Sequence, residues 1–405
     1  MRLPQQAIPA IFLLLLVVGA GAQNTSNRMR MLYIGDYTSS NPGVVAIESD
    51  PKILPSYVPA TTGWFAEDEI QRAMRLYLPR TYDSYVDSSD ITVLSDADPW
   101  SLPDAWNFYI QRSVAEDSHS LLMTGGHRGL GGTGAARQHW DGTPVEAVLP
   151  VTIVSSSIIG QIGLGATLKP IIVRPEDPLM MSLPWEACPW LTEVNEVIEK
   201  QGAITPLVLE DGGYPVISYW DYSQGRSLTF GGDWHGYSTR AMQYWQFFDD
   251  AVINMIYHAG KLDLPPDPII ANQIRSSFKK FRLMEAGLNS VLEFVEKFGA
   301  NTFPVRKDME TVRDIRRDGE RRYLEQDFLS ALARMDEAIQ EMQELEKRAV
   351  GLQESALLWV YTIEWLVVTA TCMVTGFAVY EIMIRRRLYR EMKTTRRAGT
   401  DRDRN

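Results

Sequence analysis

Only five histidines occur in this sequence of 405 residues, and two of them are the most informative candidates for acid–base chemistry. His127 directly follows a glycine pair, and His235 lies shortly after another. Together with Asp96 or Asp233 they could form an acid–base site or bind a metal, because a carboxylate can orient an imidazole and both groups are metal ligands. The alternative is that they are ordinary polar residues in loops, since their spacing matches no metal-binding motif.

A glycine-rich loop is the second feature of the sequence that could take part in chemistry. It begins with Gly125, Gly126 and His127 and contains six glycines within ten residues. Backbone N–H groups in such a loop can converge on a carbonyl or an anion. We therefore predict a ligand site formed by these three residues with Asp36 and Asp96. A loop that only connects a strand to a helix is the alternative, because the spacing of a phosphate-binding P-loop is absent.

The two cysteines do not supply a nucleophile of the usual kind. A nucleophilic cysteine needs a sharp strand-to-helix turn and a nearby base. Cys188 is followed by Pro189, which cannot continue a helix, and Cys372 lies inside an apolar segment. We expect no disulfide between them, no bound cofactor and no metal site built on cysteine.

Short apolar runs separated by turn residues predict the elements that must position these groups. Because the carboxyl ends of parallel strands meet at one edge of a sheet, we expect Asp36, Asp96 and the glycine-rich loop to lie together there. The pattern indicates an α/β fold with strands at 30–34, 91–94, 121–124, 214–219 and 227–230, and helices at 103–116 and 240–258.

Several sequence blocks in this region resemble a known family. They occur at residues 90–96, 121–132, 143–146, 177–179 and 222–226. In this order the blocks resemble membrane-linked proteins with a class I glutamine amidotransferase-like domain, and the resemblance covers about residues 30–258. It implies a flavodoxin-like parallel sheet and places Gly125 and Gly126 at the strand end that forms an oxyanion hole.

The resemblance does not extend to the catalytic cysteine. We therefore predict a non-catalytic module that binds a ligand or partner, or acts as a scaffold. The alternative is a hydrolase or metal-assisted enzyme that uses His127, His235 and an aspartate at the strand ends.

Two apolar segments predict a membrane-anchored protein. The first follows Arg2 and resembles a secretory signal, with an uncleaved anchor as the alternative. The second is long enough to span a bilayer and is followed at once by three arginines, which places the C-terminal tail in the cytoplasm and the N-terminal domain outside the plasma membrane. The predicted parts are a signal peptide (1–22), an amidotransferase-like domain (28–260), a helical hairpin and coiled-coil stalk (265–356), a transmembrane helix (357–384) and a basic tail (385–405).

A heptad pattern runs without interruption from Leu324 to Ala356. We expect one helix over residues 308–356 that continues into the membrane span. Its apolar seam could pack against a helix at residues 270–298 in a hairpin, or against a second copy in a homo-oligomer.

The distribution of charge along the sequence limits the classes of partner that the protein could bind. The tail holds nine Lys and Arg against three Asp and Glu, whereas the whole chain has a formal net charge of -11. The outer region is therefore acidic, which argues against nucleic-acid binding. The predicted partners are the lipid bilayer and a protein that contacts the stalk and the transmembrane helix. Glu364 could contact such a partner's helix, or could reach the lipid headgroups.

Overall fold

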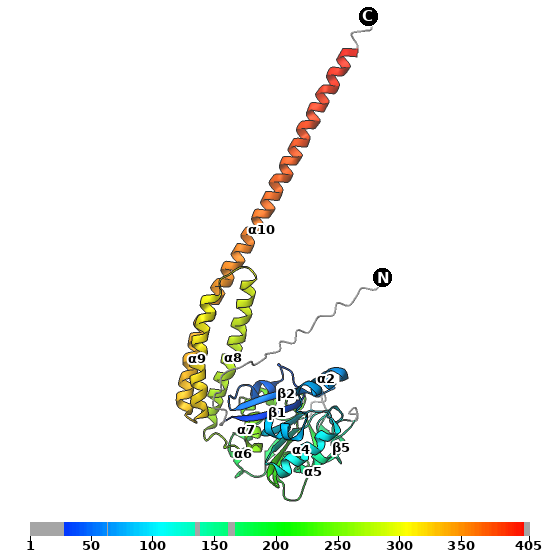
Figure 1. Ribbon diagram of the computed structural model, residues 1–405, viewed down its shortest axis with the longest axis vertical. Coiled ribbons are helices and arrows are strands. Elements are labelled where there is room, and N and C mark those ends of the chain that lie inside the picture. The colour runs from blue at the N-terminus through cyan, green and yellow to red at the C-terminus, as the bar shows by residue number, and fades with distance from the viewer. Residues whose placement is uncertain (1–27, 63, 134–137, 161–166, 401–405) are drawn as a thin grey trace. The chain divides into compact units, whose positions relative to one another are not determined.

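The computed structural model describes residues 28–62, 64–133, 138–160 and 167–400, with side chains up to residue 390. The predicted signal peptide lies outside the described residues. The chain forms two compact units, one of Met1–Arg275 with Tyr323–Asp327 and one of Ser276–Arg322 with Phe328–Asn405. Figure 1 gives the element labels used below.

An eight-stranded mixed sheet forms the centre of the first unit. Its five parallel strands are, in order, β2 (Ile53–Pro59), β1 (Met29–Gly35), β3 (Ile91–Ser95), β4 (Ser120–Thr124) and β10 (Gly225–Phe230). Three antiparallel strands continue it, namely β9 (Pro215–Tyr222), β8 (Ile204–Leu209) and β6 (Pro170–Ile172).

The prediction of a wholly parallel sheet is therefore wrong for one side of the sheet. A parallel connection needs a crossover of a dozen or more residues, whereas Ser223 and Gln224 alone separate β9 from β10. Ser223 has a φ of 55°, which the tight hairpin requires. The two strands were predicted as neighbours, but their direction was not.

Helices and short loops cover both faces of the sheet and enclose two hydrophobic clusters. On one face α7 (Phe248–Ala259) packs with α1 (Pro42–Ile47), and on the other α4 (Asp104–Glu116) packs with α5 (Pro144–Val148). The remaining helices are α2 (Glu67–Tyr77), α3 (Tyr82–Ser88) and α6 (Pro178–Met181).

The helix predicted at residues 240–258 starts later than expected. Only α7 is α-helical, and a separate 3-10 turn occupies Met242–Tyr244. Asp249 and Asp250 lie in the first turn of α7, where negative charge stabilises the positive end of the helix dipole. Of the aromatic residues before α7, Trp245 and Phe247 are buried and Tyr244 is exposed.

A buried ion network closes the first unit. The Arg275 guanidinium donates to Asp50 at 3.0 Å and to Asp250 at 2.7 Å, and all three side chains are almost fully buried. The hydroxyls of Tyr257 and Tyr323 also donate to Asp50. Removing one member of such a cluster leaves buried charge uncompensated, which typically costs about 3–5 kcal/mol.

A separate two-stranded sheet of β5 (Val151–Gly160) and β7 (Glu193–Glu199) was not predicted. Its strands are antiparallel with an irregularity between Ile153 and Ile158. The backbone N–H of Asn195 donates to the carbonyl of Gly231 at 2.9 Å, which fixes β7 beside the end of β10.

Three helices contribute to the second unit, namely most of α8 (Pro268–Glu296), most of α9 (Phe303–Leu324), and α10 (Phe328–Thr400). Figure 1 shows α8, α9 and the first part of α10 side by side. Ion pairs join Glu285 to Arg313 at 2.5 Å and Asp318 to Arg334 at 2.8 Å.

The single helix expected over residues 308–356 is therefore wrong. The chain reverses at residues 325–327, where Gln326 has a φ of 64°. Leu324 and Phe328 are four residues apart on either side of this turn, so the apolar spacing passes through it unchanged. Spacing alone could not reveal the break.

The heptad seam of α10 is buried inside one chain. Its buried members are Ala331, Met335, Ala338, Met342, Leu345, Ala349 and Ala356. A Cβ built on Gly319 of α9 would lie 3.1 Å from the Met335 sulfur, which shows how closely these two helices approach. The seam thus packs against the chain's own helices, and α9 supplies a neighbour that the predicted hairpin lacked.

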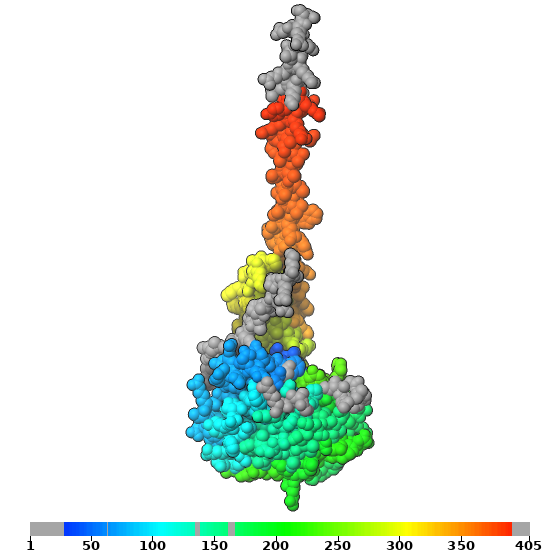
Figure 2. All heavy atoms as spheres, turned by 90° about the vertical axis from the view of Figure 1, so that its right-hand side faces the viewer, coloured from blue at the N-terminus to red at the C-terminus, as the bar shows by residue number. Residues whose placement is uncertain are grey.

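The distal part of α10 is apolar and uncovered. By length and composition, it is the one helix among the described residues that could cross a membrane, with a mean hydropathy of 1.7 in its most apolar window. None of that window is buried by other parts of the chain, as the orange and red part of α10 in Figure 2 illustrates. The seam and the apolar segment belong to one continuous helix, as predicted.

Candidate functional site

The structure brings all the sequence-predicted site residues to one edge of the main sheet. Asp36 follows β1, Asp96 follows β3, Gly125 begins the loop after β4, and Asp233 and His235 follow β10. At this edge lies a pocket of about 210 Å³, called here the strand-edge pocket. Its lining residues are Thr61, Trp64, Asp96, His127, Arg128, Thr133, His235 and Tyr237.

Asp36 and His235 form a buried carboxylate–imidazole pair beside the pocket. The Nδ1 atom of His235 lies 2.6 Å from one carboxylate oxygen of Asp36, and the other oxygen accepts a hydrogen bond from the Tyr33 hydroxyl at 2.6 Å. The Asp36 side chain is fully buried and that of His235 nearly so. A carboxylate that fixes an imidazole in this way is the arrangement that orients a general base in many hydrolases.

Asp233 has a structural role in the loop after β10. Its carboxylate accepts hydrogen bonds from the backbone N–H groups of Gly236, Tyr237 and Ser238. One of its oxygens also lies 3.7 Å from Nε2 of His235. Asp233 therefore holds the loop in shape while adding negative charge next to the imidazole.

Electrostatics keep His235 protonated. Burial alone would lower the pKa of this imidazole, but the hydrogen bond to Asp36 and the charges of Asp233, Asp36 and Asp96 together raise it to about 9. At neutral pH the ring is an imidazolium. It can donate a proton or stabilise negative charge, whereas a general base must first lose its proton.

Asp96 is strained and lies beneath the glycine-rich loop. Its φ of 43° falls in the left-handed region, which is uncommon for a residue other than glycine. One carboxylate oxygen accepts hydrogen bonds from the N–H groups of Arg128 at 2.6 Å and Gly129 at 2.9 Å. These backbone donors, which the sequence suggested could hold an anion, thus hold the protein's own carboxylate.

The protonation of Asp96 is finely balanced. Burial raises the pKa of its carboxyl most strongly, the His235 charge lowers it and the Asp36 charge raises it again, with a result of about 7. Asp96 can therefore exist in either form near neutral pH. Perturbed groups of this kind in a pocket are typical of functional sites.

Gly125 and Gly126 are required for close packing. A Cβ on Gly125 would lie 2.2 Å from the carbonyl oxygen of Gly231, and one on Gly126 would lie 2.4 Å from an oxygen of Asp96. The Gly125 N–H donates to the carbonyls of Phe230 and Gly232, and the Gly126 N–H donates to Asn195. Both donors are used inside the protein, so in this conformation neither is directed at a ligand.

His127 lies on the rim of the pocket. Its ring stacks on Tyr237, with centroids 5.4 Å apart, and its Nε2 lies 3.0 Å from an oxygen of Glu193. That contact with Glu193 raises the pKa of His127 above its usual value, although burial opposes the shift. His127 is partly exposed and belongs to the lining of the pocket.

Several residues of this site were not predicted. Trp64 is half exposed, and its ring meets the His235 ring edge-on at 5.7 Å. Glu193 and Asn195 reach the site from β7, which is part of the separate sheet. No local pattern marks Trp64 as exposed or connects β7 with the end of β4.

Cysteine chemistry has no support in the pocket. Cys188 follows the 3-10 turn Trp185–Ala187 and is not among the residues that line the pocket. Burial raises the pKa of its thiol to about 12, so the reactive thiolate is disfavoured. Within the described part of the chain, no group of three or more His, Cys, Asp and Glu side chains is arranged to hold a metal ion.

Comparison with known protein families indicates what kind of domain the first unit contains. A family model described as "Putative glutamine amidotransferase" matches residues 88–259. The chain therefore contains a glutamine amidotransferase-like domain, and the match includes every predicted site residue except Asp36. The first two strands of the sheet lie outside the matched residues.

Solved structures are similar at low sequence identity. Cytoplasmic Protein STM1381 from Salmonella typhimurium LT2 is 17% identical, with a TM-score of 0.47, and the alignment covers 57% of this chain and 99% of that chain. Cytoplasmic Protein STM3548 from Salmonella typhimurium is 18% identical, with a TM-score of 0.44 and coverages of 56% and 98%. No curated protein matches the sequence.

Proposed function

We propose that this protein is a membrane-anchored ligand-binding module whose amidotransferase-like domain does not hydrolyse glutamine through a cysteine. The observation that carries the proposal is the strand-edge pocket, which gathers charged and aromatic side chains but has no cysteine among its described lining residues. Both histidines at the pocket are held by a carboxylate, since Asp36 fixes His235 and Glu193 contacts His127. A preorganised set of this kind favours binding of a small polar molecule.

The anchor is part of the same proposal. The apolar segment of α10 is long enough to span a bilayer, and Arg385, Arg386 and Arg387 follow it. The positive-inside rule then gives a cytoplasmic tail and an amidotransferase-like domain outside the plasma membrane. Protease protection of the tail and of the domain in sealed vesicles tests this orientation, and cleavage of both parts from the same side contradicts it.

Ammonia release from L-glutamine tests the absence of amidotransferase chemistry. Full-length protein in lipid nanodiscs should release no ammonia above the level of empty nanodiscs. Steady release that disappears in His235→Ala or His127→Ala overturns the non-catalytic proposal.

Ligand-observed NMR with L-glutamine, L-glutamate and inorganic phosphate tests binding on the same preparation. At least one probe should bind, and Trp64→Ala should weaken its binding. Trp190→Ala is the matched control, because Trp190 is exposed to the same degree but does not line the pocket. No binding by any of the probes, or equal weakening by both variants, contradicts the proposed site.

A second candidate function is acid–base hydrolysis without a cysteine. The observation that favours it is the 2.6 Å contact between Asp36 and His235, with Asp96 able to take up or lose a proton near neutral pH. In this case Asp96 in its charged form would activate water and the His235 imidazolium would donate a proton. Asp96→Asn should then abolish turnover of a generic ester such as p-nitrophenyl acetate, and unchanged turnover contradicts this candidate.

A further inference from the structure

A second pocket lies at the opposite edge of the same sheet. Arg226 is near the start of β10, whereas the strand-edge pocket lies beyond the end of this strand. This opposite-edge pocket has a volume of about 620 Å³, well within the range of small-molecule sites. It is lined by α6, by Tyr219 of β9, and by the end of α7 with the residues that follow it.

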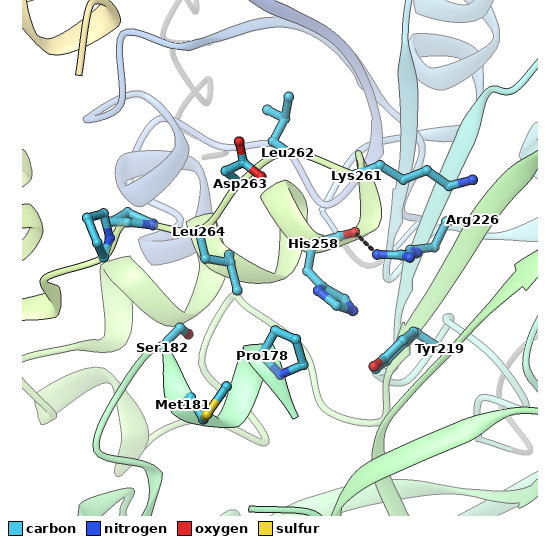
Figure 3. Close-up of a pocket in the computed structure, with 12 residues that line it drawn as sticks. Pro178, Met181, Ser182, Tyr219, Arg226, His258, Lys261, Leu262, Asp263 and Leu264 are labelled. Atoms are coloured by element: carbon cyan, nitrogen blue, oxygen red, sulfur yellow. Dashed lines mark hydrogen bonds between the residues drawn. The ribbon is translucent and has the colours of Figure 1, made fainter. Parts of the chain in front are cut away.

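The two sides of the opposite-edge pocket differ in chemistry. Figure 3 shows Arg226 and Lys261 on one side, and Met181 and Leu264 on the other. Pro178, Leu262, Pro265 and Pro266 extend the apolar lining. A molecule that fills the pocket would therefore contact cations at one end and hydrocarbon at the other.

The cationic side carries excess positive charge. Arg226 and Lys261 share one carboxylate, that of Asp221, at 2.9 Å and 3.3 Å, so two cations face a single anion. Arg226 also donates to the His258 carbonyl, and Lys261 donates to the Gln224 carbonyl. Neither side chain uses all of its donors, since a guanidinium has five N–H groups and an ammonium has three.

His258 provides an independent indication of a missing partner. The residue is 6% exposed, and its Nε2 is buried without any hydrogen-bond partner. Figure 3 shows the imidazole pointing into the space between Pro178 and Tyr219, and the Tyr219 ring meets it edge-on at 4.2 Å. Burial, together with the Arg226 charge, lowers the pKa of His258 to about 4, so the ring is neutral and can form a hydrogen bond.

The other polar groups around the pocket do not offer a competing cation site. Asp177 accepts hydrogen bonds from the Tyr219 hydroxyl and the Leu179 N–H. Ser182 donates to the Leu179 carbonyl and accepts from Asn254. Asp263 is an exposed rim carboxylate, and it is the one acidic side chain among the described lining residues.

We propose that the opposite-edge pocket binds a small amphipathic carboxylate, with its charged group at Arg226 and Lys261 and its apolar chain against Pro178, Met181 and Leu264. His258 contributes a neutral hydrogen-bonding group beside the carboxylate. This site is separate from the strand-edge pocket and does not depend on the function proposed above.

Ligand-observed NMR with three matched probes tests the proposal. Hexanoate, hexylamine and hexan-1-ol have the same chain length and differ in the head group. Each is titrated against full-length protein in nanodiscs, and the signal from empty nanodiscs is subtracted. Hexanoate should bind at least about tenfold more tightly than the other two probes, as expected for a charged hydrogen bond.

Substitutions of lining residues test whether hexanoate binds in the opposite-edge pocket. Lys261→Gln removes one cation from a partly exposed position and should raise the Kd of hexanoate about tenfold, and Arg226→Gln and His258→Leu should each weaken binding in the same direction. Lys169→Gln is the control, because Lys169 also pairs with a surface carboxylate but lies outside the pocket, and it should leave the Kd unchanged.

Two results overturn the proposal. One is tighter binding of hexylamine than of hexanoate, which would assign the site to cations through Asp263. The other is a Kd for hexanoate that does not change in Lys261→Gln and Arg226→Gln. Trp64→Ala separates the two pockets, since it should not alter hexanoate binding.

Discussion

His235 and His258 lie beyond opposite ends of the same sheet and differ in charge. Both are largely buried, and burial lowers the pKa of both. His235 has Asp36 at 2.6 Å and Asp233 at 3.7 Å, and its pKa rises to about 9. His258 has no hydrogen-bond partner for Nε2, and burial together with the Arg226 charge lowers its pKa to about 4.

The surrounding charges, and not the degree of burial, therefore decide whether a buried histidine in this fold is charged. At the strand-edge pocket the protein supplies the counter-charges of His235 itself, so this imidazolium needs no ligand to balance its charge. At the opposite-edge pocket a neutral group and two cations are left with unused hydrogen-bonding capacity. The strand-edge pocket thus contains an imidazolium that is already paired with carboxylates. The opposite-edge pocket is suited to bind a charged group from solution.

Removing the carboxylate that holds His235 should have the largest effect. Asp36→Asn leaves the imidazolium without its main partner, and loss of one member of a buried ion pair typically costs about 3–5 kcal/mol. We expect a loss of about 3 kcal/mol in the free energy of unfolding at pH 7, measured by urea denaturation with tryptophan fluorescence. The control, Asp263→Asn, alters an exposed carboxylate and should change it by less than about 0.5 kcal/mol. Equal effects of the two changes would remove the basis of the comparison.

The pH dependence of stability should reveal the charge of His235. Its pKa is raised on folding from 6.5 to about 9, so the folded state binds more protons in this range. Its stabilising contribution is complete below pH 6.5 and is lost as the pH rises through 9, with a total of about 3 kcal/mol. His235→Gln should flatten this decline in unfolding midpoints measured from pH 6.5 to 9. An unchanged slope would show that the ring is not charged in the folded state.

His258 should show the opposite sign and a smaller effect. Its pKa is lowered on folding to about 4, so its contribution is complete above pH 6.5 and is lost as the pH falls through 4. His258→Leu should therefore reduce the acid sensitivity between pH 6.5 and 4, so that between pH 7 and pH 5 the variant loses about 2 kcal/mol less stability than the wild type. The slope should not vanish, because His119 is also buried with a pKa lowered to about 4. A steeper slope in the variant would contradict the neutral state assigned to His258.

Much of the strand-edge pocket could be predicted from the sequence. Asp36, Asp96 and Gly125 each follow a short apolar run, and strand ends of a parallel sheet meet at one edge. The exact roles of the groups at these strand ends could not be predicted in the same way. Whether the N–H groups after Gly126 hold a ligand or a carboxylate depends on the strained backbone of Asp96, which no local pattern encodes.

In the helical second unit the sequence predicted the buried positions but not the number of helices. The heptad pattern correctly marked the residues that are buried on α10, but it also continued across the turn at 325–327. A turn of three residues between apolar positions four residues apart preserves the periodicity. The number of helices and the partner of the seam therefore had to come from the tertiary structure.

The sequence by itself determined the α/β character, the strand ends that carry the polar residues and one apolar segment long enough for a membrane span. These features follow from local composition and spacing, which act over a few residues. Only the tertiary structure decided the antiparallel half of the sheet, the contribution of β7 to the strand-edge pocket and the opposite charges of His235 and His258. Those depend on groups distant in the chain, such as Asp36 and His235, which meet only when the sheet has formed.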